Sequence, residues 1–485
     1  GRVNLGAYGG TEQASLSLAG RRLVLYSPLG GEVWNAVQSV YWLASGNWGT
    51  NDRVKLEVSR DAGQTWQAIA NAEALPHNLD HFEWDVRTTA SSGRCRVRVS
   101  AADDPSVQDQ SEFNFFVHHS GVAYYVNDFE TAGDVYCTAA GNNGNDGFSP
   151  DAPKAGIQAV IDAYDLEPGD VIWVDSGTYS GQVYLTASDA GVRVVGPPAP
   201  AVALVEASTD CAIYLYQVAD VTVERLWVRN RSGKGVFLNN CDRCRLEGLT
   251  VFSCPSYGVL VYNSRDGVLA HNLVYGNGAQ GVFLYGPSQR WQVENNTVCW
   301  NGTQEVYVES GCTDVSLRNN ILWHWGSGSA LWLDGNPARV NSDYNDLYVS
   351  GGGSVGYWNY TAYPTLAQWR VARGADLHSL SEDPQFVDAN GFDNLLGGDN
   401  FRDDDFHLKS TAGSFHQGWW LPDLSESSCL DMGDQDTEYS REPAPNGGRV
   451  NLGAYGGTEQ ASLSLAGRRL VLYSPLGGEV WNAVQ

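Results

Sequence analysis

The 485-residue sequence has one methionine and only four lysines, Lys55, Lys154, Lys234 and Lys409. It also lacks an apolar run of about 18 residues, the length that a membrane-spanning helix requires, so no membrane-spanning segment is predicted. Acidic residues outnumber basic ones by 56 to 30, which gives a net charge of −26. Nucleic-acid binding needs a basic surface that replaces counterions, so this balance predicts that the chain does not bind nucleic acid.

Cysteines are few for the length, nine in all, and they are spread along the chain. This spacing excludes the dense disulfide framework of a small secreted domain. Cys241 and Cys244 form a single CxxC motif, but a zinc site needs a second pair of ligands at suitable spacing, and none follows. The prediction is therefore that these cysteines pack in a core or a turn. By contrast, 55 glycines, 24 tyrosines and 17 tryptophans are typical of a turn-rich β protein.

One exact internal repeat organises the sequence. Residues 1–38 recur without change as residues 448–485, so the period from residue 1 to residue 448 is 447 residues. Such identity predicts a tandem array in which each unit contacts mainly its neighbours, joined head to tail. On this interpretation, residues 1–20 are the end of the preceding repeat, and residues 468–485 begin the next.

Residues 21–119 show the alternation of short β-strands. Val54, Leu56 and Val58 alternate with polar residues, and turn residues follow at 61–63. Regularly spaced short strands predict a β-sandwich. Two motifs, SPLGGEVW at 27–34 and VKLEVSRDAGQTW at 54–66, resemble the Ig-like domains of secreted bacterial multidomain proteins. That resemblance implies a spacer or contact module, whose tryptophans are expected in the core and not on a sugar-binding surface.

Apolar triplets recur at nearly constant spacing after residue 210. The first begins at Ile213, and the next begin at Val236, Val259, Val282, Val306 and Leu331. A second marker with the same period consists of Asn272, Asn296, Asn320 and Asn345. Asparagines stacked in register can hydrogen-bond from one coil to the next, and a single coil cannot bury its own apolar face. The pattern therefore predicts the stacked coils of a parallel β-helix.

Motifs at both ends of residues 120–467 resemble bacterial right-handed parallel β-helix proteins of the pectate-lyase-like superfamily. They are NNGNDGFSP at 142–150, PGD at 168–170, GTY at 177–179, DPQFVD at 383–388, DFHLKS at 405–410 and PNGGRVNLGAYGGT at 445–458. The amphipathic stretch 155–164 predicts a short helix that caps the first coil. The expected class is thus all-β, with an Ig-like β-sandwich followed by a right-handed parallel β-helix.

The β-helix fold alone does not decide whether the chain is an enzyme, because lyases, hydrolases and adhesins share it. The motifs NTD, GHG and RIK that a polygalacturonase would carry are missing. The strongest catalytic arrangement would join Glu305 and Glu309, on one strand, to Lys234 or Arg265. A calcium-dependent polysaccharide lyase and a carbohydrate-binding adhesin therefore stay as alternatives.

Metal binding is predicted in one acidic, glycine-rich loop. Oxygen ligands on a flexible backbone suit Ca²⁺, and the candidate ligands are Asp388, Asp393, Asp399, Asp403 and Asp405. The Asn142–Asp146 turn is a weaker candidate, and no other cofactor is expected. The sequence as a whole predicts a non-catalytic structural repeat unit of an extracellular or cell-surface filament, whose partners are neighbouring copies of itself and, as a further option, glycans.

Overall fold

The computed structural model describes residues 11–12, 20–89, 92–117, 121–335, 339–416 and 418–465. Strands and turns dominate these residues, which confirms the all-β class. The chain divides into two compact units, Gly1–Val122 and Ala123–Gln485. Most of the segments assigned to neighbouring repeats, 1–20 and 468–485, lie outside the described residues. Within the described ranges, no helix is long and apolar enough to cross a membrane.

The first unit is a β-sandwich of two small sheets. One sheet has the order β1-β3-β7, with bounds Arg22–Ser27, Val37–Ser45 and His81–Asp85. The other has the order β2-β10-β8-β4-β5, with β6 beside β4 and β9 beside β8. Its bounds are Val33–Trp34 (β2), Arg53–Ser59 (β4), Gln67–Ala68 (β5), Leu75–Pro76 (β6), Ser92–Ala101 (β8), Gln108–Gln110 (β9) and Phe115–Val117 (β10), and a 3₁₀ turn, η1, spans Val86–Thr88.

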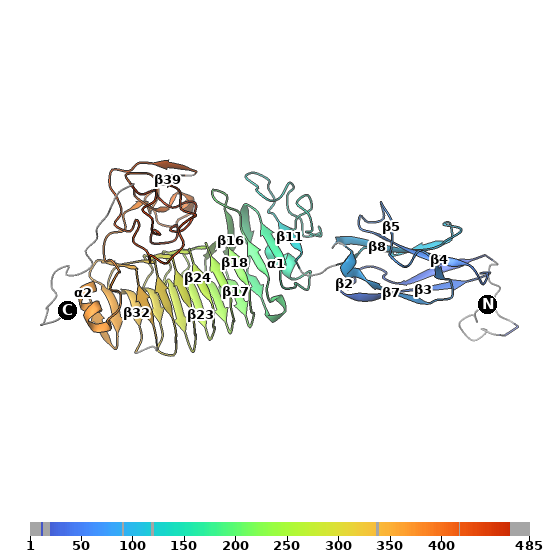
Figure 1. The fold of residues 1–485 in the computed structure, drawn as a ribbon, viewed down its shortest axis with the longest axis horizontal. Helices are drawn as coiled ribbons and strands as arrows, with labels where there is room; N and C mark the ends of the chain where they lie inside the picture. Colours follow the sequence, from blue (N-terminus) through green and yellow to red (C-terminus); the bar gives the residue numbers. More distant parts are fainter. Residues whose placement is uncertain are drawn as a thin grey trace. The chain divides into compact units, whose positions relative to one another are not determined.

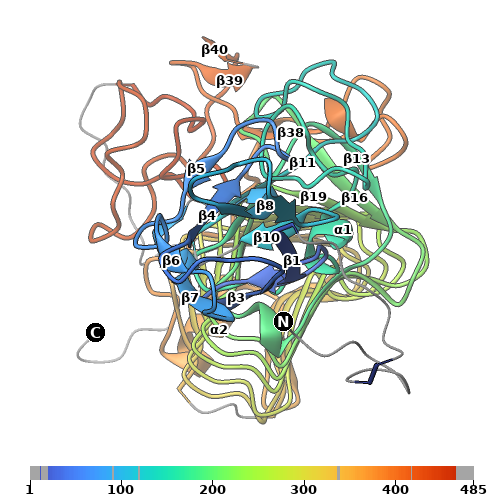
Figure 2. The same cartoon turned by 90° about the vertical axis from the view of Figure 1, so that its right-hand side faces the viewer.

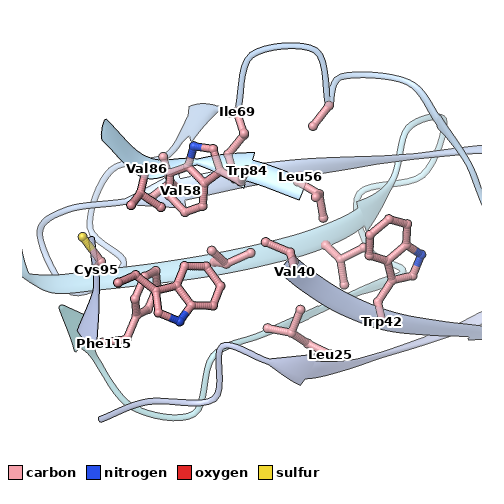
Figure 3. Close-up of a cluster of buried hydrophobic side chains, with 14 of the residues drawn as sticks. Leu25, Val40, Trp42, Leu56, Val58, Ile69, Trp84, Val86, Cys95 and Phe115 are labelled. Atoms are coloured by element: carbon pink, nitrogen blue, oxygen red, sulfur yellow. The ribbon is translucent and has the colours of Figure 1, made fainter. Parts of the chain in front are cut away.

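Side chains from both sheets fill the space between them (Figure 3). The apolar positions of the predicted alternation are buried, Leu56 completely. Trp34 contacts Phe115 with ring centroids 5.0 Å apart and Trp84 at 6.1 Å. The prediction of core tryptophans is confirmed at Trp34. Trp66, in contrast, is half-buried beneath the guanidinium of Arg98, which lies 4.3 Å from its ring centroid.

The second unit contains a parallel β-helix, in which each coil contributes one strand to each of three sheets (Figure 1). Sheet 1 consists of β11 (Ala123–Val126), β12 (Val171–Val174), β15 (Arg193–Val195), β18 (Thr222–Glu224), β21 (Arg245–Glu247), β24 (Val268–Ala270), β27 (Gln292–Glu294), β30 (Ser316–Arg318) and β33 (Asn341–Asp343). Sheet 2 consists of β13 (Gly177–Ser180), β16 (Ala203–Ala207), β19 (Trp227–Asn230), β22 (Thr250–Phe252), β25 (Leu273–Tyr275), β28 (Thr297–Cys299), β31 (Ile321–Trp325) and β34 (Asp346–Ser350).

Sheet 3 carries the apolar triplets seen in the sequence. Its parallel strands are β14 (Val183–Leu185), β17 (Cys211–Tyr216), β20 (Lys234–Asn239), β23 (Val259–Tyr262), β26 (Val282–Tyr285), β29 (Gln304–Val308), β32 (Ser329–Leu333) and β35 (Ser354–Trp358), and the antiparallel β36 (Thr361–Tyr363) ends it. The register pairs Val236 with Val259 and Val259 with Val282, as the repeat predicts. Seen end-on, the coils superpose (Figure 2).

Buried asparagines connect successive coils at the turn between sheets 1 and 2, which we call the first amide ladder (Asn272, Asn296, Asn320 and Asn345). Asn272 Nδ2 donates to Asn296 Oδ1 at 2.9 Å, and Asn296 Nδ2 donates to Asn320 Oδ1 at 3.0 Å. Asn320 Nδ2 donates to Asn345 Oδ1 at 2.9 Å. The predicted ladder is confirmed, and each of its asparagine-to-asparagine hydrogen bonds runs toward the C-terminal end of the β-helix. The same Nδ2 groups also donate to carbonyls of the coil before, Leu246, Leu269 and Val293.

The first amide ladder ends on a buried carboxylate. Asn345 donates its backbone N–H to Ser379 Oγ at 2.9 Å, and Ser379 Oγ donates to Asp376 Oδ1 at 2.7 Å. Ser342 Oγ and the indole of Trp369 also donate to Asp376, at 2.8 and 2.7 Å. Trp369 lies on α2 (Leu366–Arg373), so this helix and the carboxylate together terminate the ladder.

A second, shorter ladder at the turn between sheets 2 and 3 was not predicted from the sequence. Asn277 Nδ2 donates to Asn301 Oδ1 at 2.9 Å, and Asn301 Nδ2 donates to Glu305 Oε2 at 2.6 Å. Glu305 is fully buried, so this ladder also ends on a carboxylate. Each ladder thus ends at a buried carboxyl group. The first ends at Asp376, through Ser379, and the second ends at Glu305.

At the first coil, α1 (Ile157–Ile161) is shorter than the predicted helix over 155–164, and η2 (Ala187–Asp189) follows β14. Residues 381–465, which we call the closing segment, fold back over sheet 2. This segment contains β37 (Phe386–Asp388), η3 (Phe401–Asp403), β38 (Asp405–Leu408), β39 (Ser414–His416) and β40 (Trp419–Leu421). Its apolar residues form one core with outward side chains of sheet 2, among them Phe252, Tyr275 and Ile321. The segment runs along the side of the coils that carries β16 (Figure 1).

The ladder makes Asn320 a sensitive position. Asn320→Ala leaves buried N–H groups of Asn296 without an acceptor and removes the donor to Asn345, so we expect a loss of about 2–4 kcal/mol in the free energy of unfolding. Denaturant unfolding followed by circular dichroism measures the loss. Gln292→Ala, on the exposed outer face of sheet 1, is the control and should change the midpoint little. Equal effects of the two substitutions would contradict the role of the ladder.

Candidate functional site

The outer face of sheet 3 carries a row of side chains that repeats from coil to coil. One outward row reads Tyr184, Tyr214, Phe237, Leu260, Phe283, Tyr307, Trp332 and Tyr357 in hydrogen-bonded register. We call this row the aromatic row. The sequence carried the signal for it, because the middle residue of most apolar triplets is aromatic. Closing-segment residues form their shared core with sheet 2, and in Figure 1 the segment lies away from β17, β23 and β32.

Several neighbouring rings of the aromatic row stack along the axis, although Leu260 interrupts the row and Tyr307 and Trp332 are tilted by 53°. Tyr214 and Phe237 have centroids 5.1 Å apart with planes inclined by 6°, and Trp332 and Tyr357 have centroids 3.5 Å apart. Phe283 and Tyr307 stack at 4.6 Å. Ring faces that contact other rings are not open to a sugar ring, so this row mainly offers ring edges to a ligand. Its direct physical effect is cross-strand attraction between coils.

A second axial row, of ion pairs, lies at the turn between sheets 3 and 1. Each arginine pairs with an aspartate one coil earlier, with N–O distances of 2.5–2.7 Å, and the pairs are Arg243–Asp220, Arg265–Asp242, Arg290–Asp266 and Arg339–Asp314. Hydrogen bonding to Arg243 lowers the pKa of Asp220. Because these groups are partly exposed, each pair alone contributes little to the free energy of unfolding. The row as a whole places a positive charge of each coil next to a negative charge of the coil before it.

The structure contradicts the catalytic arrangement that the sequence suggested. Glu305 is buried inside the coil and contacts His324, whereas Glu309 Oε2 accepts from the backbone N–H of Gly286 at 2.9 Å. Lys234 pairs with Asp210 at 2.6 Å, and Arg265 pairs with Asp242. The error comes from a departure from strand alternation, because Glu305, the second residue of β29, is buried next to the equally buried Val306. The two carboxylates therefore do not meet either base.

Glu305 and His324 form a deeply buried titratable pair. The N–H of Gly328 donates to His324 Nε2 at 2.9 Å, so the ring proton lies on Nδ1, which donates to Glu305 Oε1 at 2.8 Å. Burial raises the pKa of Glu305, against the opposing effect of its hydrogen bonds to His324 and Asn301. Both side chains are almost completely inaccessible to solvent, so the pair terminates a ladder and does not face a substrate.

A Ser–His–Asp grouping occurs on the closing segment and was missed in the sequence, where Ser-x-His was its only signal. Ser414 Oγ and His416 Nε2 are 3.0 Å apart, but His416 Nδ1 and Asp405 Oδ2 are 4.0 Å apart. Asp405 instead contacts Nδ1 of His407 at 2.7 Å. Ser414 is fully buried. A serine nucleophile must reach its substrate, so this geometry does not form a catalytic triad.

The predicted calcium ligands occupy different environments. Asp388 lies opposite Asp405 in the β37–β38 pair, and Asp399 lies 3.5 Å from a guanidinium nitrogen of Arg229. Asp403 Oδ2 accepts from Asn400 Nδ2 at 2.8 Å. In the described part of the chain, no group of three or more His, Cys, Asp or Glu side chains is placed to hold a metal ion. The calcium site stays a prediction that these side-chain positions do not favour.

The weaker candidate, the Asn142–Asp146 turn, contains a positive charge. Lys154 is buried, and its Nζ donates to the carbonyl oxygens of Asn143 and Asn145 at 3.3 and 2.8 Å. The ammonium group of Lys154 thus occupies the carbonyl oxygens that would otherwise be available to bind a metal cation in this turn. All nine cysteines are buried and unpaired, Cys241 and Cys244 included, as the packing prediction expects.

Buried carboxyl groups hold the closing segment on sheet 2. Asp346, on the outer face of β34, accepts from the N–H of Glu382 at 3.0 Å. Asp404 Oδ2 accepts from the hydroxyl of Tyr275 and from the N–H of Gly397, both at 2.8 Å. The other oxygen of Asp404 is buried and has no hydrogen-bond partner among the described residues.

A third such group, Glu442, lies within the closing segment. Its Oε1 accepts from the N–H groups of Asn451 and Gly457 at 2.8 and 2.7 Å. Burial raises the pKa of Asp346 to about 7, that of Asp404 to about 6 and that of Glu442 to about 7. These three carboxyl groups therefore change protonation state between pH 5 and 8.

Comparison with known proteins identifies the coils. Residues 208–368 match the family model of the right handed beta helix region. The coils are a right-handed β-helix. This match covers a third of the chain. A search of curated proteins found no match to the chain.

Several solved structures are similar at a distance. An alginate lyase from Paenibacillus sp. str. FPU-7 is 14% identical, with 41% of this chain and 91% of that chain covered and a TM-score of 0.32. A mannuronan C-5 epimerase A-module from Azotobacter vinelandii is 14% identical, with 49% and 80% covered and a TM-score of 0.25. Geobacillus virus E2 ORF18 is 13% identical, with 39% and 52% covered and a TM-score of 0.28. Likeness at this level assigns no activity to the present chain.

The raised pKa values of Asp346, Asp404 and Glu442 predict a pH-dependent stability. Each folded pKa lies above the unfolded value near 4, so the folded state binds more protons, and stability falls as pH rises from about 4 to about 8. Melting temperatures at pH 4–8 measure the fall, and Asp404→Asn should flatten part of it. The exposed Asp165→Asn is the control. A stability that rises over this range would contradict the assignment.

Proposed function

We propose that the chain is a non-catalytic structural repeat unit of an extracellular or cell-surface array, in which copies of one sandwich and one β-helix follow each other head to tail. The placement outside the cell rests on the resemblance of the sandwich motifs to modules of secreted proteins. The proposal rests on one observation, the way in which the duplicated segment divides between two folded units.

The first part of the duplicated segment belongs to the β-helix unit. In the second copy, Val450, Asn451 and Leu452 are buried in the closing segment, as is Ser464. The second part belongs to the sandwich, because in the first copy Arg22–Ser27 form β1 and Val33–Trp34 form β2. One continuous segment therefore ends a β-helix and begins a sandwich.

This division leaves a short connection between consecutive units. The last buried residue of the β-helix copy is Ser464, and the counterpart of the first strand residue Arg22 is Arg469. Only residues 465–468 lie between them. Each repeat would thus pass directly from one packed unit into the next, as tandem arrays with neighbour-to-neighbour contacts do.

The surfaces of the β-helix support a structural role over a catalytic one. The amide ladders, the aromatic row and the Arg–Asp row all run along the axis and join one coil to the next. Retaining and inverting glycosidases need two carboxyl groups flanking the scissile bond, whereas Glu305 lies inside the coil and the Asp partners of the axial row are paired with arginine. The polysaccharide lyase and the glycan-binding adhesin stay as alternatives without a specific contact in their favour.

The array predicts the mass of the native chain. On a denaturing gel, native material should give a polypeptide far heavier than the 52.6 kDa of this sequence. Electron microscopy should show filaments with one repeated motif per 447 residues. A native chain of a single unit's mass, in monodisperse particles, would contradict the array, and release of unsaturated products from alginate or polygalacturonate would support the lyase instead.

A further inference from the structure

Residues 449–464, which we call the docking segment, occupy a defined site on the β-helix. The N–H of Gly453 donates to the carbonyl of Asn319 at 2.8 Å, and the N–H of Ala454 donates to Thr297 Oγ1 at 3.0 Å. Asn295 Nδ2 donates to the carbonyl of Asn451 at 3.1 Å. Two neighbouring coils thus supply the side chains and the carbonyl that hold the backbone of the docking segment.

The remainder of the closing segment completes this site. Glu442 binds the N–H groups of Asn451 and Gly457, and Ser462 Oγ donates to the carbonyl of Leu408 at 2.7 Å. The indole of Trp420 donates to the carbonyl of Ala461 at 3.0 Å. The site therefore recognises the docking segment through backbone groups, buried apolar side chains and one carboxyl group.

The connection that leads into the docking segment is mostly exposed. Residues 443–448 are exposed or half-buried, in contrast to the buried residues on either side, Glu442 and Val450. The docking segment is thus held mainly by its contacts with the coils and with the rest of the closing segment. The exposed connection at residues 443–448 contributes little to this recognition. A segment of the same sequence on another chain would present the same groups.

Such a segment exists in every copy of the chain. Residues 2–17 are identical to residues 449–464, so each chain contains one docking site and two segments that fit it. We propose that the docking site is exchangeable and binds residues 2–17 of a second copy of this chain, which joins copies head to tail without a covalent bond. The inference extends the proposed array by naming the contact between copies, but it does not depend on how many repeats one polypeptide contains.

Matched substitutions in the two identical segments test the exchange. Leu452→Asp with Ala461→Asp places two charges at buried positions and should release the docking segment of that chain. The site is then free for residues 2–17 of a neighbour, so light scattering should detect oligomers that grow with concentration. Adding Leu5→Asp and Ala14→Asp, the equivalent changes in the first copy, should return the protein to a monomer.

The four-substitution protein exposes the same site as the two-substitution protein, so it controls for aggregation through exposed core. Oligomers in the two-substitution protein alone support the exchange. Equal masses for the two proteins, whether monomeric or aggregated, would overturn it. Neither result changes the mass of the native chain, so failure here is distinct from failure of the proposed array.

A peptide gives an independent measurement on the same variant. A fluorescent peptide of residues 1–20 should bind the Leu452→Asp, Ala461→Asp chain at one per chain, and at least about tenfold more tightly than it binds the unaltered chain, whose own segment competes for the site. The same peptide with Leu5→Asp and Ala14→Asp should not bind. Absence of binding by the unaltered peptide would refute the proposal even if oligomers form.

Discussion

Stacking of the coils depends on buried amide groups that must be hydrogen-bonded in register. Asn272, Asn296 and Asn320 each accept through Oδ1 from the coil before and donate through Nδ2 to the next asparagine of the ladder. An unpaired amide in this dry interior would cost about as much as a lost core side chain. The direction of donation is the same at each step. The ladder therefore ends in a donor, the N–H of Asn345, which Ser379 accepts. Asp376 then accepts from the hydroxyls of Ser342 and Ser379 and from the indole N–H of Trp369.

Several levels of the structure follow from this requirement. Between Asn272 and Asn345 the ladder joins neighbouring coils in the same register in which aliphatic side chains and aromatic rings stack. The lateral closing segment can then contact a continuous face of sheet 2, in which Arg229 pairs with Glu206 at 2.6 Å and lies 5.2 Å from the ring of Phe401. The carboxyl groups whose pKa values are raised to between about 6 and 7 lie in the closing segment, as Asp404 and Glu442 do, or directly against it, as Asp346 on β34 does, so pH acts on the attachment of this segment.

Periodic features could be predicted from the sequence, and features made by distant residues could not. The spacing of Val236, Val259 and Val282 fixed the coils because local alternation and a constant period are visible in one dimension. The ladder residue Asn296 was predicted for the same reason. Glu305 was misplaced because its side chain is buried next to the buried Val306, which breaks the alternation expected along β29. The calcium prediction relied on a cluster of aspartates close in sequence, but the fold separates Asp399, beside Arg229, from Asp405, beside His407.

The uniform direction of the amide ladder also governs how such a protein can change in length. A whole additional coil with its own asparagine preserves every donor and acceptor, whereas a partial coil leaves at least one amide unpaired on each side of the insertion. Strands in neighbouring coils lie about 4.8 Å apart. The length of the β-helix can therefore evolve only in steps of roughly that size, each step adding one complete coil.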